Sequence, residues 1–173
     1  MVLLIRKYNQ FEGKEDNGLL CMTLDKSAPL NLDHTLDCGQ VFRWEKRNNL
    51  WYGIVGDIVI KVRCDGDKLL FQTFPEELGI SFIHRYFRLD DDLPNITSKI
   101  CKDTVIQRAI NEFYGLRIIR QDPWECIISY ICATFSNIPR IKGMVRNLSK
   151  KDRRFTATDA IYFSFPNDFF IFP

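Results

Sequence analysis

The spacing of apolar residues along this 173-residue chain changes once, near Phe74. Before that residue, short runs rich in β-branched and aromatic side chains are separated by the turn signals Gly56-Asp57 and Asp65-Gly66, which are typical of β-hairpins. After it, apolar residues recur every three or four positions, as in amphipathic helices. Strands followed by helices predict an α+β fold, or a β domain that leads into an α domain.

These patterns locate the first elements. We expect three or four antiparallel strands, at about residues 41–45, 50–55, 58–63 and 68–73. A helix that opens at Pro75-Glu76-Glu77 should run to about Arg88, because proline and acidic residues suit a first helical turn. Two further helices are expected at about residues 94–101 and 104–114, and Gly115 should end the second of them.

The next helix has the clearest start. Asp122, Pro123 and Glu125 match an N-cap, a proline at the first helical position and the glutamate of a capping box. Apolar residues then follow at helical spacing, which predicts one buried face. This face would comprise Trp124, Ile127, Ile128 and Ile131.

The last helix should begin at Asn137 as its cap, with Pro139 tolerated in its first turn. Its apolar stripe would comprise Ile138, Ile141, Val145 and Leu148, beside a basic edge of Lys142, Arg146 and Lys150. Seven of the fifteen residues from 140 to 154 are Lys or Arg, against one acid. Such a patch attracts polyanions; the alternative is an ordinary solvated helix face.

Composition excludes several classes of protein. With 46% apolar and 13% aromatic residues, the chain has enough material for a core, which argues against intrinsic disorder. No apolar run approaches the ~18 residues of a membrane span, and the apolar residues 1–5 lack the length and order of a signal peptide. We therefore expect an intracellular protein with no membrane partner.

Cysteine and histidine usage predicts neither disulfides nor a metal site. None of the six cysteines forms a C-x-x-C pair, and His34 and His84 are far apart in the sequence. We expect reduced thiols that mostly fill the core. The chain has no glycine-rich phosphate loop and no recognisable nucleophile motif, so no cofactor is predicted. The residues alone indicate an α+β protein whose basic helical corner touches nucleic acid.

Two sequence blocks resemble the 8-oxoguanine DNA glycosylase family. The first, Asp37-Cys38-Gly39-Gln40-Val41-Phe42-Arg43-Trp44, is similar to a signature of that family's N-terminal domain. The second, within residues 115–145, is similar to the opening of its helix-hairpin-helix domain and includes Gln121-Asp122-Pro123-Trp124-Glu125-Cys126 and Asn137-Ile138-Pro139-Arg140-Ile141. A short segment at residues 162–166 also matches.

The resemblance implies a twisted antiparallel β-sheet domain followed by an all-α helix-hairpin-helix domain, here truncated. On this basis we expect a lead-in at residues 1–18, a β-sheet domain with helices at 19–115, and the start of the helical domain at 116–173. Residues 152–173 lose most of the family pattern.

The resemblance also implies base-excision repair. Members of the family bind duplex DNA, flip an oxidised guanine that pairs with cytosine, cut its glycosidic bond through a lysine Schiff base and nick the strand by β-elimination. The catalytic lysine and aspartate would lie beyond residue 173, so no catalytic residue is predicted here, and Lys142, Lys150 and Lys151 lack the expected context. Two alternatives stay open: a non-catalytic DNA-binding fragment, and a half-enzyme that needs a second chain carrying the catalytic hairpin. The location would be the nucleus of a eukaryote or the cytoplasm and nucleoid of a prokaryote.

Residue by residue, the resemblance assigns a substrate-binding group of Gly39, Gln40 and Phe42. The carbonyl of Gly39 would read the protonated N7 of 8-oxoguanine, and the missing side chain allows this close approach; Phe42 would be support packing. A DNA-binding group comprises Asn137, Arg140, Lys142 and Arg146. In that group, the guanidinium of Arg140 can donate two parallel hydrogen bonds to the edge of the orphaned cytosine. The alternatives are a simple turn glycine and a solvated arginine.

Phe135 and Ser136 depart from the asparagines that the family carries at these positions. Phe135 either wedges into the base stack, as apolar side chains can, or packs inside the protein. The preference for the base opposite the lesion is therefore left open.

Overall fold

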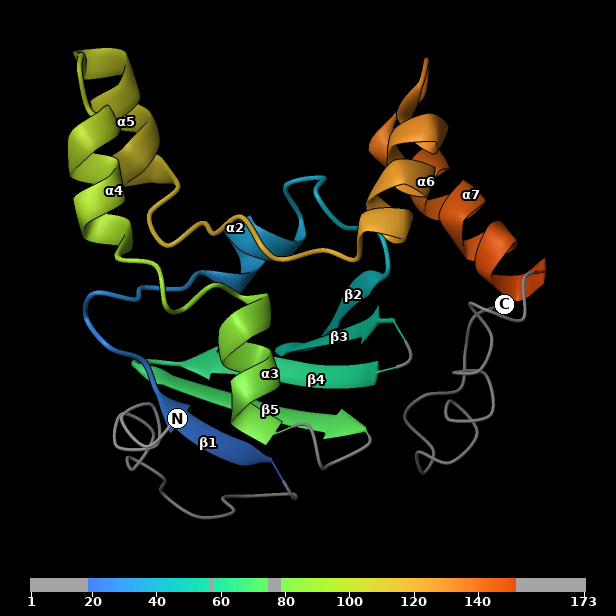
Figure 1. Cartoon of the computed structure of the whole chain (residues 1–173), viewed down its shortest axis with the longest axis horizontal. Helices are drawn as coiled ribbons and strands as arrows, with labels where there is room; N and C mark the ends of the chain where they lie inside the picture. The colour runs from blue at the N-terminus through green and yellow to red at the C-terminus, as the bar shows by residue number, and fades with distance from the viewer. Residues whose placement is uncertain (1–18, 57, 75–78, 152–173) are drawn as a thin grey trace.

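The computed structural model describes residues 19–56, 58–74 and 79–151. A five-stranded antiparallel sheet forms the base of the molecule (Figure 1). Two helical pairs stand on opposite sides above it, α4 (Leu93–Ile100) with α5 (Thr104–Glu112) and α6 (Pro123–Ala133) with α7 (Ile138–Lys151). The predicted α+β fold is confirmed. Predictions for residues 1–18 and 152–173, including the match at 162–166, lie outside the described residues. No helix in the described ranges is long and apolar enough to cross a membrane.

Four strands form the predicted meander: β2 (Trp44–Arg47), β3 (Leu50–Val55), β4 (Ile58–Asp65) and β5 (Lys68–Phe74). Val55 pairs with Ile58, and Asp65 pairs with Lys68, so the hairpins close around the predicted turns. Gly53 lies opposite Trp44, where a Cβ would collide with the indole ring. The glycine therefore makes room for a buried tryptophan in the sheet.

The sequence does not predict two elements and places the start of the first strand of the meander wrongly. β1 (Leu20–Thr23) pairs with β5 and completes the sheet order β1-β5-β4-β3-β2. α2 (Leu32–Leu36) is capped by Asn31, whose side-chain oxygen accepts the His34 N–H at 3.0 Å. The first strand of the meander begins at Trp44 rather than at residue 41, because the chain bends before it; Val41 still reaches the core.

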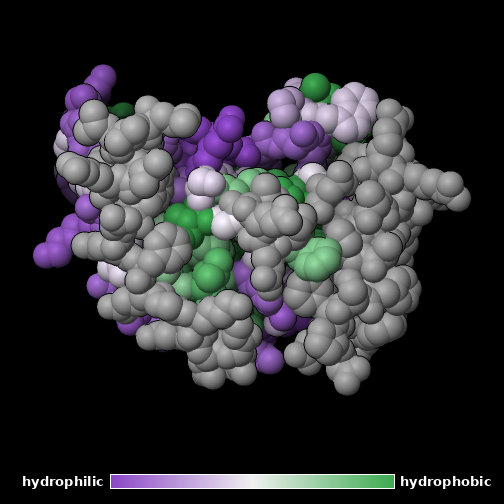
Figure 2. All heavy atoms as spheres, turned by 60° about the horizontal axis from the view of Figure 1, so that its bottom comes forward, coloured by the Kyte–Doolittle hydropathy of each residue, from purple (hydrophilic) through white to green (hydrophobic). Residues whose placement is uncertain are grey.

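The core lies between one face of the sheet and helices α2 and α3 (Gly79–Tyr86). Phe71 and Ile83 are completely buried there. The indole N–H of Trp44 donates to the Tyr86 hydroxyl at 3.0 Å, and burial raises the pKa of Tyr86 so that the hydroxyl stays neutral. In the view turned so that the bottom of Figure 1 comes forward, apolar residues are visible in the middle of the molecule, with hydrophilic residues above them (Figure 2).

α3 ends two residues before the predicted end, and Arg88 follows it with a φ of +52°. Its predicted start at residues 75–77 lies outside the described ranges. α4 (Leu93–Ile100) and α5 (Thr104–Glu112) confirm two predicted helices, and the side chains of Asp92 and Asp103 cap them. Neither helix has a buried residue.

Gly115 does not end α5, which stops three residues earlier. Its φ is +83°, and a Cβ there would lie 2.8 Å from the backbone nitrogen of Asn31. That nitrogen donates to the Gly115 carbonyl at 2.8 Å. The glycine is required because the chain crosses the start of α2 at this point.

α6 (Pro123–Ala133) and α7 (Ile138–Lys151) begin where their caps predict. The predicted buried face of α6 is wrong, since Trp124, Ile127 and Ile131 are 55%, 51% and 58% exposed. α6 packs against α7, and the side that carries these three residues remains more than half exposed.

The predicted stripe of α7 is confirmed in part. Ile141 and Val145 are buried, whereas Ile138 and Leu148 remain exposed. The cysteines also differ from expectation. All six are free thiols, but only Cys21 is buried. Cys38, in the α2–β2 loop, and Cys126, on α6, are exposed.

Candidate nucleic-acid interface

The two sequence blocks that are about a hundred residues apart meet in space. The loop between α2 and β2 rises beside the α6–α7 pair (Figure 1). Asp37 in this loop forms an ion pair with Lys142 of α7, at 3.0 Å between Oδ1 and Nζ. Gly39 faces the first residue of α7, since a Cβ on it would lie 3.5 Å from Cδ1 of Ile138. The two blocks therefore form one surface.

Gly39 has a φ of +88°, a conformation that side chains strongly disfavour. It lies two residues after Asp37 and is half-buried. The backbone conformation alone therefore requires glycine at this position. The close approach of a ligand would be a second, separate reason for the glycine. Phe42 is also half-buried, as support packing would require.

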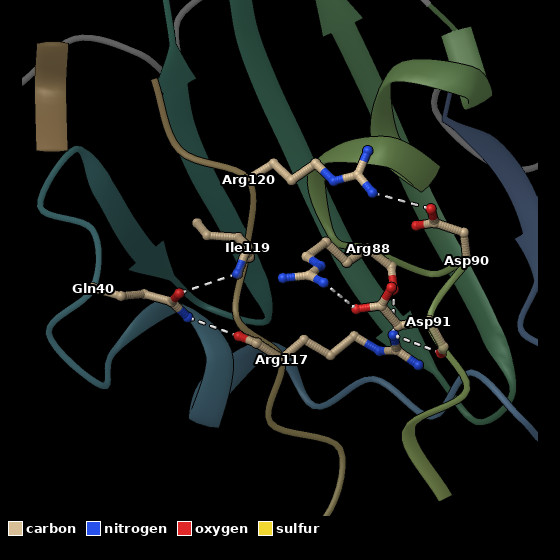
Figure 3. Close-up of polar contacts among 7 residues, drawn as sticks. All are labelled: Gln40, Arg88, Asp90, Asp91, Arg117, Ile119 and Arg120. Atoms are coloured by element: carbon tan, nitrogen blue, oxygen red, sulfur yellow. Dashed lines mark hydrogen bonds and ion pairs between the residues drawn. The ribbon is translucent and has the colours of Figure 1, made fainter. Parts of the chain in front are cut away.

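Gln40 links this loop to the segment that enters α6 (Figure 3). Its Nε2 donates to the carbonyls of Thr35 at 2.7 Å and Arg117 at 2.8 Å. Its Oε1 accepts the Ile119 N–H at 3.1 Å. The carboxamide thus holds the backbone next to Gly39 in place. Its assignment to substrate binding stays a prediction.

Arg117 was singled out by no sequence argument, yet it is one of the few buried polar residues. Its guanidinium donates to the backbone carbonyl of Pro29. It also donates to the backbone carbonyls of Arg88 and Asp91 (Figure 3). Burial lowers the pKa of Arg117, and the nearby aspartates oppose this shift. These bonds fasten the segment before α6 onto the sheet region. A sequence pattern does not reveal them, because all the acceptors are main-chain atoms.

In the described contacts, the three aspartates at 90–92 form ion pairs or cap a helix, so they stabilise the fold. Asp91 pairs with Arg88 at 2.8 Å, and Asp90 pairs with Arg120 at 3.1 Å (Figure 3). Asp92 caps α4. Within the described residues, no three metal-ligating side chains lie together.

Glu125 does not complete a capping box, which corrects the prediction. Asp122 alone caps α6, and its Oδ1 accepts the N–H groups of Trp124 and Glu125 at 2.9 and 3.0 Å. The Glu125 carboxylate turns to Arg43, 3.5 Å away, with both side chains almost buried. Burial raises the pKa of Glu125, and Arg43 opposes this shift. The Arg43 contact ties α6 to the β2 end of the first sequence block.

The start of α7 carries the predicted DNA-binding residues. The side-chain oxygen of Asn137 accepts the Arg140 N–H at 3.1 Å, so its capping role is confirmed. Arg140 and Arg146 are exposed, whereas Lys142 is partly engaged by Asp37. Arg140 has no acidic partner among the described residues. Phe135 is fully exposed, which excludes the alternative that it packs inside the protein.

Comparisons with known proteins agree with this geometry. A family model described as 8-oxoguanine DNA glycosylase, N-terminal domain, matches residues 22–127. The N-glycosylase/DNA lyase OGG1 of Arabidopsis thaliana is 30% identical over 135 residues, which are 69% of this chain and 37% of that protein. The N-glycosylase/DNA lyase of Saccharomyces cerevisiae is 30% identical over 163 residues, which are 84% and 43%.

Solved structures show the same similarity. The structure of MBOgg1 in complex with a low affinity DNA ligand has a TM-score of 0.72 at 30% identity. The match covers 82% of this chain and 48% of MBOgg1. The 8-oxoguanine glycosylase/lyase of Clostridium acetobutylicum, in complex with double-stranded DNA containing cytosine opposite 8-oxoguanine, has a TM-score of 0.73 at 29% identity, with 83% and 49% covered.

The present chain spans less than half the length of these relatives. The family model covers more than half of the present chain. It includes the α2–β2 loop and the first residues of α6, but not the start of α7. The α7 residues lie within the longer structural matches. The chain belongs to the 8-oxoguanine DNA glycosylase family.

Proposed function

We propose that these residues perform the DNA-binding and lesion-binding part of an 8-oxoguanine glycosylase reaction. The observation that carries the proposal is the meeting of the α2–β2 loop with the start of α7. It places Gly39, a candidate reader of the lesion, beside Ile138 at the start of α7. The first turn of the same helix carries Arg140, a candidate reader of the opposite base. A base-excision enzyme needs both readings at one place.

The chemistry of the lesion explains the assignment of Gly39. 8-Oxoguanine carries a hydrogen on N7, where guanine has a lone pair. A carbonyl oxygen at that position accepts a hydrogen bond from the lesion and repels the normal base. The flipped base becomes accessible to such a group only after it leaves the stack.

Arg140 supplies the complementary contact in this proposal. Its exposed guanidinium can donate to the edge of the cytosine left without a partner. Lys142 and Arg146 lie on the same helix and would contact the phosphates. Because Lys142 already pairs with Asp37, we expect it to contribute less to phosphate binding.

Cleavage would require an amine that attacks C1′ of the flipped nucleotide while the bond to N9 breaks, followed by β-elimination from the resulting imine. We assign this step to a lysine and an aspartate outside these 173 residues. Lys142 is held by Asp37, which argues against it as the nucleophile. The site of action would be chromosomal DNA, in the nucleus of a eukaryote or in the nucleoid of a prokaryote.

The test compares binding to duplexes that contain 8-oxoguanine or guanine opposite cytosine, measured by fluorescence anisotropy over a series of salt concentrations. The variants are Arg140→Ala and, as a matched control, Arg108→Ala, which removes the same charge from an exposed position on α5. Arg140→Ala should weaken binding to the lesion duplex about tenfold, within the range for one bidentate base contact. Arg108→Ala should change it less than twofold.

If both variants lost the same affinity for the lesion duplex, the interface would bind DNA only through non-specific charge attraction. Treatment with borohydride tests the catalytic assignment, because it reduces an imine to a stable covalent link between protein and DNA. The 173-residue chain should give no such product. A covalent product would overturn the assignment of the nucleophile to other residues.

A further inference from the structure

α7 meets the α2–β2 loop at two points that lie one helical turn apart. Ile138, the first residue of α7, lies beside Gly39, since a Cβ on the glycine would be 3.5 Å from its Cδ1. Lys142, four residues later, donates to the Asp37 carboxylate at 3.0 Å. Residues four positions apart share one face of a helix. The loop therefore contacts one defined face of α7.

Arg140 lies between these two contacts in the sequence but on another side of the helix. Residues two positions apart on a helix do not face each other, and Arg140 is exposed. α7 thus carries one candidate reader on its exposed side, and its other side holds the loop that contains the second reader, Gly39. A shift or rotation of α7 against the loop would change the separation of the two readers.

Two anchors flank Gly39 within the loop. Gln40 binds the main chain of α2 and of the segment that enters α6. Asp37 is the C-cap of α2, where its N–H donates to the carbonyl of Asp33 at 3.1 Å, and its carboxylate reaches Lys142 on α7. Gln40 therefore holds the loop to the body of the protein, whereas Asp37 holds it to the helix that carries Arg140.

The polar contact is better suited than the apolar one to define how α7 sits on the loop. Gly39 has no side chain, and Ile138 remains 42% exposed, so their contact buries little surface. Hydrophobic contacts are also non-directional. A hydrogen bond between charged groups favours a narrow range of distances and angles. The bond from Lys142 to Asp37 therefore defines the position of α7 along the loop.

From these contacts we infer that Lys142 is a positioning residue, which acts through Asp37 to set the spacing between Gly39 and Arg140. This inference rests on the proposed function. A duplex presents the lesion and the opposite base at a fixed spacing, so both readers bind at once only if their own spacing matches. Recognition sites are held in such geometry by supporting hydrogen bonds. Lys142 would thus determine selectivity for the lesion without touching either base.

A positioning role and a phosphate contact predict different results at Asp37. If Lys142 serves phosphates only, Asp37 competes with them, and Asp37→Asn should strengthen binding to every duplex by the same factor. If the ion pair positions the loop, Asp37→Asn should lower the selectivity, as Lys142→Ala should. Selectivity is the affinity for a duplex with 8-oxoguanine opposite cytosine divided by the affinity for one with guanine opposite cytosine.

The test measures this selectivity by fluorescence anisotropy with the complete 173-residue chain. The variants are Lys142→Ala, Lys142→Arg, Asp37→Asn and the double variant of Asp37→Asn with Lys142→Ala. The matched control is the pair of Lys46 with Asp33, which joins β2 to α2 at 2.6 Å. Its side chains are 39% and 58% exposed, against 33% and 61% for Lys142 and Asp37, so both pairs are similarly solvated.

Lys142→Ala and Asp37→Asn should each lower the selectivity about threefold, within the range for one exposed ion pair. The double variant should lower it no further, because both changes break the same contact. Lys142→Arg should retain most of the selectivity, since a guanidinium can bind the same carboxylate. Lys46→Ala and Asp33→Asn should change the selectivity by less than about 1.5-fold, because their pair does not join the loop to α7.

The inference is overturned if Lys142→Ala weakens binding to both duplexes by the same factor, or if Asp37→Asn strengthens both by the same factor. It is also overturned if the two losses add in the double variant, or if the control pair lowers the selectivity as much. In each of these cases the unmodified chain still prefers the lesion, and the proposed function stands. If the unmodified chain shows no preference for the lesion, the proposed function fails, and the inference fails with it before any variant is measured.

Discussion

The sheet region buries its large apolar residues, whereas α6 leaves several of its own exposed to solvent. Phe71 and Ile83 are completely buried between the sheet and its covering helices, whereas Trp124 and Ile131 on α6 are more than half exposed. Both regions nevertheless form regular elements at the positions that local signals indicate. The difference teaches that caps and prolines, rather than burial, determine where α6 begins.

The two regions are joined by polar contacts more than by a shared core. Arg43 pairs with Glu125 at 3.5 Å, and Asp37 pairs with Lys142 at 3.0 Å. Gln40 and Arg117 add hydrogen bonds to main-chain atoms. The stability of the chain should therefore come from the sheet, and the α6–α7 pair should be free to use its surface for contact with a ligand.

The largest effect should come from the sheet. Phe71→Ala removes a ring with no exposed surface, and such deletions cost about 3–5 kcal/mol. Tyr130→Ala on α6 should change the free energy of unfolding by about 0.5 kcal/mol or less, because the ring is already solvated. Urea unfolding measures both values.

If Phe71→Ala does not fold, Ile60→Val provides a milder probe of the same core, with an expected loss of about 0.5–1.5 kcal/mol. A loss above about 1 kcal/mol for Tyr130→Ala would contradict the comparison, since the α6 surface would then be covered in solution.

A medium effect should distinguish two glycines, one at the interface and one within α7. Gly39→Ala forces a side chain into a φ of +88°, which should cost about 1–2 kcal/mol. Gly143→Ala places a methyl group in open space within a helix and should stabilise the chain by about 0.5–1 kcal/mol. Thermal unfolding measures the opposite signs. If Gly39→Ala were neutral, the backbone requirement at this position would be refuted.

The sequence predicts features that depend on neighbouring residues. The turns at Gly56 and Asp65-Gly66 fix the meander, and Asp122 and Asn137 fix two helix starts. The sequence does not predict features that depend on residues far along the chain. β1 is defined only by its pairing with β5, far along the chain, and Glu125 leaves its expected cap because Arg43 offers a nearly buried charge partner.

The candidate site divides in the same way. The resemblance singles out Gly39 and Arg140, and the structure brings their segments together. Neither the resemblance nor the pattern reveals that Gln40 is committed to the backbone of Arg117 and Ile119. The exposure of Phe135 was one of two open alternatives, and only the fold of the turn decides between them.

The smallest effect should come from an exposed ion pair within the sheet region. Asp33 accepts two hydrogen bonds from Lys46 Nζ at 2.6 and 2.7 Å and one from the Trp51 indole at 2.8 Å. The Lys46 bond is the main cause that lowers the pKa of Asp33, while partial burial opposes it. Because 58% of the Asp33 side chain is exposed, Asp33→Asn should cost less than about 1 kcal/mol at pH 7.

The pH dependence of this pair has a definite sign. Since the folded pKa of Asp33 lies below the ordinary carboxyl value of about 3.9, its stabilisation is present above that value and is lost as the pH falls through the lowered pKa. Urea unfolding of Asp33→Asn should therefore differ from the unmodified chain at pH 7 and converge with it in acid. Asp37→Asn is the matched control, because it removes the same charge from the pair that joins the loop to α7. The loss of unfolding free energy in both variants should be smaller in 1 M salt. A loss above about 2 kcal/mol for Asp33→Asn that does not change with salt would contradict the prediction. It would mean that the ion pair of the sheet region, and not the pair that joins the loop to α7, is shielded from water.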